Sequence, residues 1–180
     1  MPIGLMDEPQ RNGRACEREA RKRLGKKWPS VFASPCRPAL EGCSHAEANR
    51  ISKALGIGLS IQAFGLFEKL RAVDDEMRAS SKLRSIVHEA HPELAFARMN
   101  GGEPVFLTKR KEPGRKKRHD LLVSHGLVPT VDRLPGAAHD DILDAIACCR
   151  TAMLIAEGKA TRLGSEQERD RYGLPMNIWF

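Results

Sequence analysis

Residues 138–146 read AHDDILDAI and begin the longest helix that the sequence predicts, His139 to Glu157. Asp141 and Asp144 are three positions apart, so their carboxylates share one helical face near its start. Two such carboxylates, about 5 Å apart, repel each other by roughly 3 kcal/mol at an effective dielectric constant near 20. A divalent cation would relieve this repulsion, and oxygen ligands at this spacing suit Mg²⁺ or Mn²⁺. The stretch therefore makes Asp141 and Asp144 candidate catalytic residues and metal ligands.

The same acids also have a structural explanation. Acidic residues in the first turn of a helix, here Asp140 and Asp141, interact favourably with the helix dipole by about 0.3–1 kcal/mol each and need no metal. Ala145, the small residue after Asp144, would let the helix lie close to a sheet and bring the acids to the ends of its strands. Asp140 is an auxiliary candidate, and the residues alone leave both explanations open.

A second group of ionisable residues lies around the end of a strand expected over Leu83 to Glu89. Glu89 would stand at the carboxyl end of this strand, where open α/β sheets place ligand sites, and is a candidate catalytic residue and metal ligand. Glu93 falls in the first turn of the next helix, which Pro92 is suited to begin. His91 would orient a phosphate or a water, or simply cap that helix. We therefore take His91 and Glu93 as auxiliary site residues.

A run of basic residues occupies positions 109–119, with seven formal positive charges and one negative. The cations are Lys109, Arg110, Lys111, Arg115, Lys116, Lys117 and Arg118. Pro113-Gly114 is expected to turn the chain before a helix, so that both halves reach one polyanion with an affinity that falls steeply with salt. No aromatic residue interleaves the run, so it predicts phosphate contacts without base stacking. A solvated helix face or loop is the alternative interpretation.

The composition predicts one basic globular domain. The chain has 180 residues, 41% hydrophobic and 29% charged, with a formal net charge of +7. Such a surface attracts polyanions, of which nucleic acid is the commonest in the cytoplasm. The sequence contains no apolar run long enough to span a bilayer and begins with no signal pattern, so we expect a cytoplasmic protein without membrane segments. Its five cysteines contain no C-x-x-C pair and are expected to be reduced.

The remaining pattern mixes helices with short strands and predicts the α/β class. Helices are expected over Ala15 to Leu24, from Ser44 to about Leu55, and from Ser60 through Val73. Met1 to Leu5 is typical of the end of a strand, and Val31-Phe32 of a short one.

Taken together in order, these motifs resemble domain-of-unknown-function family 429, described as predicted nucleases of the RNase H-like superfamily. The resemblance covers nearly the whole chain. The segments that carry it are Pro2-Ile3-Gly4-Leu5, Gly13 to Arg21, Ser30-Val31-Phe32, Gly58 to Ala63, Arg71 to Asp74, Glu89 to Glu93, Lys109-Arg110-Lys111, Gly114-Arg115, Asp141 to Ala145 and Asp170 to Ile178. The D-x-x-D-A element is also similar to the last acidic motif of RuvC-type Holliday-junction resolvases.

The resemblance implies an RNase H-like fold, a mixed five-stranded sheet flanked by helices. It also implies phosphodiester hydrolysis with two divalent metals, Mg²⁺ or Mn²⁺. Asp141 and Asp144 match the acidic element of the family's last helix, and Glu89 is an auxiliary ligand. Family members carry their first acids on strands that precede the Pro-Ile-Gly-Leu segment, whereas here Met1 directly precedes Pro2. We therefore expect residues 1–180 to form a single RNase H-like domain that lacks its first strands.

Three functions compete at this point. The first is a metal-dependent nuclease acting on DNA or RNA, and the second is a truncated remnant of such an enzyme. The third is a non-catalytic, basic module that binds nucleic acid through the run at positions 109–119. Mutation of Asp141 and Asp144 distinguishes the first from the third, because only cleavage depends on these acids.

Overall fold

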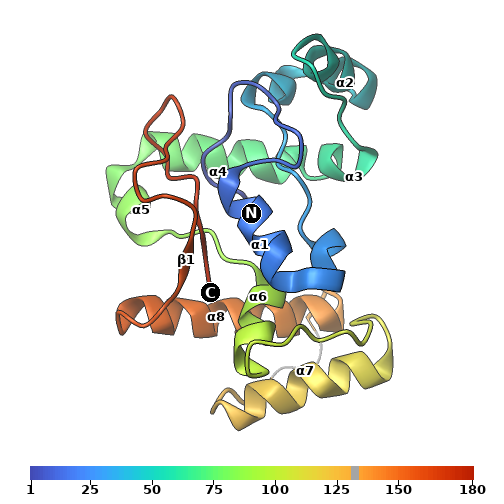
Figure 1. The fold of residues 1–180 in the computed structure, drawn as a ribbon, viewed down its shortest axis with the longest axis vertical. Helices are drawn as coiled ribbons and strands as arrows, with labels where there is room; N and C mark the ends of the chain where they lie inside the picture. The colour runs from blue at the N-terminus through green and yellow to red at the C-terminus, as the bar shows by residue number, and fades with distance from the viewer. Residues whose placement is uncertain (131–133) are drawn as a thin grey trace. The chain divides into compact units, whose positions relative to one another are not determined.

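The computed structural model describes residues 1–130 and 134–180, which form mainly helices (Figure 1). The α-helices are α1 (Ala15–Leu24), α2 (His45–Ala54), α3 (Ile61–Phe64), α4 (Phe67–Ala79), α5 (Ser81–Ile86), α6 (Pro92–Met99), α7 (Glu112–Ser124) and α8 (His139–Ala156), with 3₁₀ helices η1 (Gly25–Ser30) and η2 (Arg37–Glu41). Within the described ranges, one sheet forms, from β1 (Arg162–Leu163) and β2 (Ile178–Trp179). These short strands are antiparallel, because Thr161 and Phe180 exchange both of their backbone hydrogen bonds.

Most helices form where the sequence predicts them, because their caps are encoded locally. The Ser44 hydroxyl accepts a hydrogen bond from Glu47 N and begins α2. The Ser60 hydroxyl accepts one from Ala63 N in the same way. The helix predicted from Ser60 through Val73 is nevertheless divided, since α3 ends at Gly65 and α4 begins after Leu66.

The strand predicted over Leu83 to Glu89 is wrong. Residues 81–86 form α5, whose N-cap Ser80 accepts a hydrogen bond from Leu83 N. The serine cap and the helix-favouring Lys82 and Arg84 outweigh the strand preference of the few apolar residues in this short segment. Two further expectations are also wrong: residues 1–5 and 31–32 form no strand, and the implied five-stranded sheet is not formed by the residues that the structure describes.

The chain divides into two compact units that are described separately. Unit 1 comprises Met1–Ala20, Val31–Glu89 and Leu163–Ile178, and unit 2 comprises Arg21–Ser30, Ala90–Arg162 and Trp179–Phe180. Unit 1 has two apolar clusters. One surrounds Phe67 and Leu70 of α4, and the other joins Ile3, Met77 and Leu174.

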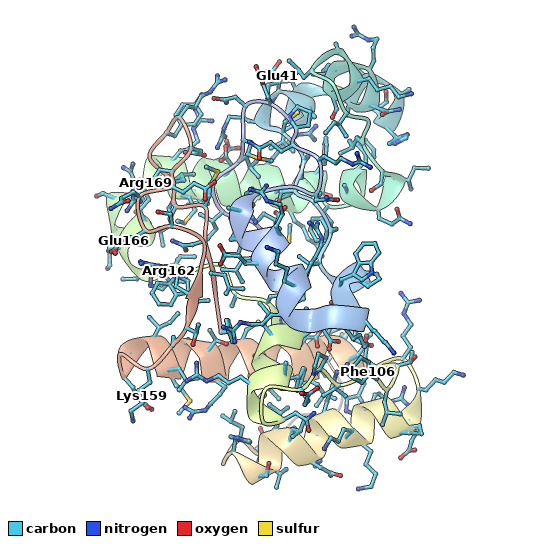
Figure 2. All side chains as sticks on the ribbon, in the orientation of Figure 1. Glu41, Phe106, Lys159, Arg162, Glu166 and Arg169 are labelled. Atoms are coloured by element: carbon cyan, nitrogen blue, oxygen red, sulfur yellow. The ribbon has the colours of Figure 1, made fainter. Side chains whose placement is uncertain are left out.

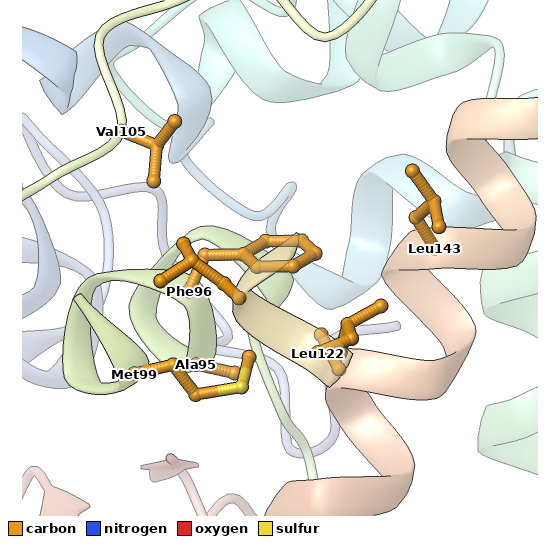
Figure 3. Packing of buried hydrophobic residues seen from close by; sticks show 8 residues of the cluster. Ala95, Phe96, Met99, Val105, Leu122 and Leu143 are labelled. Carbon is orange, nitrogen blue, oxygen red and sulfur yellow. The ribbon is translucent and has the colours of Figure 1, made fainter. Parts of the chain in front are cut away.

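The core of unit 2 is formed where α6, α7 and α8 pack on one another. Phe96, Leu122 and Leu143 are fully buried in it, and Figure 3 shows the Phe96 ring between side chains of the other helices. Burying each of these side chains contributes about 1.5–3 kcal/mol. This core fixes the starts of α6, α7 and α8, where the ionisable residues of unit 2 lie.

Gly114 explains why α7 begins where it does. The turn predicted at Pro113-Gly114 is wrong, since both residues lie in the first helical turn. A Cβ atom at Gly114 would stand 2.1 Å from the carbonyl oxygen of Thr108. The absence of a side chain therefore lets α7 pack directly against the loop that precedes it.

In the described part of the chain, every helix is too short or too polar to cross a membrane. All five cysteines are free thiols.

Candidate functional site

The acids at the start of α8 have different surroundings. Asp141 is exposed, and its carboxylate accepts a hydrogen bond from Ala138 N at 3.2 Å, so it caps the helix. Asp144 is half-buried and accepts a hydrogen bond from Lys109 Nζ at 2.5 Å. The same ammonium group lies 3.6 Å from Asp140 Oδ2. One lysine of the basic run therefore lies between the two acids of α8 that are least exposed and is hydrogen-bonded to Asp144.

Asp144 is only partly satisfied by this lysine. Its second oxygen, Oδ1, is buried and has no hydrogen-bond partner among the described residues. Burial raises the pKa of Asp144 and outweighs the lowering caused by Lys109. For Lys109, burial lowers the pKa, but the hydrogen bond and charge of Asp144 dominate, so this pKa is raised. Asp144 is thus a carboxylate with one free, desolvated acceptor.

We expect the stability of the protein to depend on pH through Asp144. Its raised pKa means that the folded state holds the proton of Asp144 more tightly than the unfolded chain does. The stabilisation that comes from this proton is therefore fully present below the ordinary carboxylate pKa and is lost as the pH rises through the raised value. Wild type should therefore gain stability relative to Asp144→Asn when the pH falls from 7 to 4, by up to about 1 kcal/mol for a pair at this depth. Urea unfolding at both pH values measures the difference. Asp141→Asn is the control, and an identical pH dependence of wild type and Asp144→Asn would contradict the expectation.

Glu93 and Arg118 form a buried ion pair that joins α6 to α7. Arg118 Nη2 donates to both carboxylate oxygens of Glu93, at 2.8 and 2.9 Å. The guanidinium also donates to three carbonyls, of Leu107 at 3.0 Å, Gly114 at 3.1 Å and Val105 at 3.4 Å. Because Arg118 is fully buried, its guanidinium is closed to a nucleic-acid phosphate in this structure, contrary to its expected place in the binding surface.

His91 precedes α6 and interacts with the same charged residues, since the charges of Glu93 and Lys109 influence its pKa. Its Nε2 lies 3.1 Å from the carbonyl oxygen of Ser30, which requires the proton on Nε2, and its buried Nδ1 has no partner among the described residues. Burial lowers the pKa of His91, so the ring is neutral at physiological pH and Nδ1 is a free acceptor. The charge of Glu93 influences the pKa of both His91 and Asp144. We refer to His91, Glu93, Lys109, Arg118 and Asp144 as the charged cluster of unit 2.

Glu89 is held in unit 1 by a different arginine. Arg14 donates to its two oxygens, from Nη1 to Oε2 at 2.9 Å and from Nη2 to Oε1 at 2.6 Å, and Ile3 N donates to Oε2 at 2.7 Å. Arg14 also donates from Nε to Glu17 at 2.7 Å and from Nη1 to the carbonyls of Ile3 and Gly4. Both carboxylates and the guanidinium are buried. The predicted metal ligand thus belongs to a network that attaches the N-terminal segment to α1.

The acids as placed do not fit a two-metal site. Glu89 is paired with Arg14, Glu93 with Arg118 and Asp144 with Lys109. Among residues 1–130 and 134–180, no group of three or more His, Cys, Asp or Glu side chains is arranged to hold a metal ion. The acceptors left over in the charged cluster are Asp144 Oδ1 and His91 Nδ1.

The other cations of the basic run lie at the first turns of α7 and on its surface. Arg110 and Lys111 are exposed just before the helix, and Arg115 donates from Nη1 to the carbonyl of Arg110 at 2.7 Å. Lys116 pairs with Asp120. Residues of a helix are about 100° apart, so Arg115 and Lys117 point to different sides of α7. We name Arg110, Lys111 and Arg115 the α7 basic patch: the first two side chains are exposed, and the third is half-buried and bonded to the backbone of Arg110.

Sequence reasoning missed the buried roles of Arg14, Glu17 and Arg118. A signal for Arg118 was present, because Gly114, Arg118, Leu121 and Leu122 recur with the spacing of one helical face. Their burial together confirms that face. No comparable local signal marked Arg14, whose main partner is 75 positions away.

Comparison with known proteins identifies one family. A model described as "Protein of unknown function (DUF429)" matches residues 1–169. No curated protein and no solved structure matches the chain.

Proposed function

The chain belongs to the DUF429 family of proteins of unknown function, and from this premise we propose that it is a non-catalytic module that binds nucleic acid through the α7 basic patch. A single observation carries the proposal. The acids of the hydrolytic motif are neutralised inside the chain or cap a helix, whereas Arg110, Lys111 and Arg115 form no ion pair with a described carboxylate. With a net charge of +7, the protein would meet nucleic acid as the main polyanion of the cytoplasm, where we place it.

Binding through this patch is electrostatic and carries no sequence readout by itself. Three cations that neutralise three phosphates give a slope of about −2 to −3 for log K against log[salt]. Lys111 is the residue that precedes α7, and its carbonyl accepts a hydrogen bond from Arg115 N at 3.1 Å, so both cations lie at the beginning of the helix, where one strand can contact them. The start of α7 adds the positive end of a helix dipole. These features favour contacts with phosphates and sugars and indicate little preference between base sequences.

The test is a comparison of two variants with the same net charge. Arg110→Gln/Lys111→Gln/Arg115→Gln removes the patch, and Lys69→Gln/Lys82→Gln/Arg84→Gln removes three exposed cations of unit 1. Anisotropy of a labelled 20-nucleotide strand should show that the patch variant binds at least about tenfold more weakly and loses most of the salt slope, while the control changes little. EDTA should leave wild-type binding unchanged. Equal losses in the two variants would contradict the proposal.

Metal-dependent phosphodiester hydrolysis, the activity that the resemblance implies, is the second candidate. One observation favours it: Asp144 Oδ1 and His91 Nδ1 are buried acceptors without a described partner. Mg²⁺ or Mn²⁺ would supply an activated water and stabilise the leaving oxygen. Such a function requires Lys109 to leave Asp144. Cleavage of DNA or RNA that needs Mg²⁺ or Mn²⁺ and is abolished in Asp141→Asn and Asp144→Asn would replace the first proposal.

A further inference from the structure

Phe106 is an exposed aromatic side chain in a chain that has few of them. The sequence contains six Phe, two Trp and one Tyr. Phe106 is 58% exposed and lies on the loop between α6 and α7 (Figure 2). Its neighbour Val105 is buried in the core of unit 2, and Leu107 is 49% exposed. The loop thus directs one ring outwards from an anchored segment.

The backbone on both sides of Phe106 is held by Arg118. The guanidinium donates to the carbonyl of Leu107 at 3.0 Å and to that of Val105 at 3.4 Å, and Glu93 fixes the guanidinium in turn. The close approach of Gly114 to Thr108 holds the next part of the loop against α7. Because this backbone is already ordered, a ligand that stacks on the ring loses little affinity to ordering the chain.

Phe106 also lies close in the sequence to two cations of the α7 basic patch. Phe106 precedes Arg110 by four positions and Lys111 by five. An extended chain spans at most about 3.6 Å per residue, so the Cα atoms of these two residues lie within roughly 18 Å of that of Phe106, the reach of a few nucleotides. An exposed ring beside cations that bind phosphates is the arrangement by which proteins hold single strands, whose bases are free to stack. In a duplex the bases are stacked on each other and present only their edges in the grooves.

We propose that Phe106 stacks on an unpaired base and gives the α7 basic patch a preference for single-stranded over double-stranded nucleic acid. The inference rests on the proposed binding function and adds the substrate class. The sequence pattern indicated phosphate contacts alone, because Phe106 lies outside the run at positions 109–119. The occupant is a nucleobase and not an apolar protein surface, because the exposed charges that follow Phe106 along the loop, Arg110 and Lys111, are cationic and complement phosphates.

The experiment compares Phe106→Ala with Leu107→Ala, which removes the adjacent exposed apolar side chain but no ring. Each is titrated with a labelled 20-nucleotide strand, the same strand made abasic, the matching duplex and heparin. Phe106→Ala should weaken binding of the normal strand by about 5- to 100-fold and leave the abasic strand and heparin unchanged. Leu107→Ala should behave like wild type. The fluorescence of 2-aminopurine in the strand should be quenched by wild type and not by Phe106→Ala.

The outcomes separate this inference from the function on which it depends. If the α7 patch variant loses binding but Phe106→Ala retains wild-type affinity for the normal strand, the stacking proposal is overturned and the binding function stands. If Phe106→Ala and Leu107→Ala lose the same affinity for all ligands, the loop is an apolar contact surface and the stacking proposal fails. If neither heparin nor any oligonucleotide binds wild type, the binding function itself is wrong.

Discussion

Replacing Arg118 by methionine should lower the free energy of unfolding by about 3–5 kcal/mol. The substitution keeps an apolar side chain of similar length but leaves the buried carboxylate of Glu93 without its cation. It also removes the donor from the carbonyls of Leu107 and Gly114. An uncompensated buried charge is among the most destabilising single changes in a protein. Urea unfolding followed by circular dichroism measures the loss.

A double-mutant cycle tests the cause of this loss. Glu93→Leu removes the charge that Arg118→Met leaves unpaired, so the double variant should be less destabilised than the sum of the two single variants. Lys117→Met is the matched control on α7, and we expect it to cost less than about 1 kcal/mol. A loss of this small size in Arg118→Met as well would show that Arg118 does not anchor the start of α7.

The same variant connects the fold to the proposed substrate. Without Arg118 the backbone around Phe106 loses both of the hydrogen bonds that hold it. In conditions where Arg118→Met remains folded, its preference for single strands should fall, while the α7 basic patch still binds heparin. A preserved preference would mean that packing of Val105 alone positions the loop.

Local sequence patterns predicted the helices better than the sheet. The start of α2 depends on the hydroxyl of Ser44, which directly precedes the helix and accepts a hydrogen bond from Glu47 N. In α8, apolar residues that include Ile142 and Leu143 recur at helical spacing along the sequence. A helix cap or an apolar spacing involves residues within one or two helical turns of each other, so it can be recognised from the sequence alone. The strand expected over Leu83 to Glu89 failed because a short apolar run does not distinguish strand from helix. Here the Ser80 cap decides for helix.

The candidate site was predicted in its residues but not in its pairings. Asp144 and Lys109 were both expected to be functional, one as a metal ligand and the other as a phosphate contact. Their ion pair joins positions 35 apart and was not predictable from either motif. Arg118 was counted with the exposed cations because charge is visible in the sequence and burial is not. Ion pairs between distant residues depend on the packing of whole elements, which the local pattern does not contain.

The second large effect is expected for Arg14→Met, which should destabilise the protein by about 3–5 kcal/mol. The guanidinium lies between the buried carboxylates of Glu17 and Glu89. Burial lowers the pKa of Arg14, but the charges of Glu89 and Glu17 more than compensate, so its pKa is raised and the group stays charged in the folded protein. Removing it leaves two like charges close together without a cation.

The metal dependence of Arg14→Met tests whether Glu89 can bind a cation other than arginine. Adding Glu89→Gln should recover part of the loss at pH 7, and Arg11→Met, an exposed neighbour, should be nearly neutral. Mg²⁺ should stabilise neither wild type nor Arg14→Met, since Ile3 N and the packed N-terminal segment close the site around Glu89. If millimolar Mg²⁺ restored the stability of Arg14→Met, Glu89 would be able to bind a divalent cation in the place that Arg14 occupies in the wild type. Glu89 would then again be a candidate ligand for metal-dependent hydrolysis.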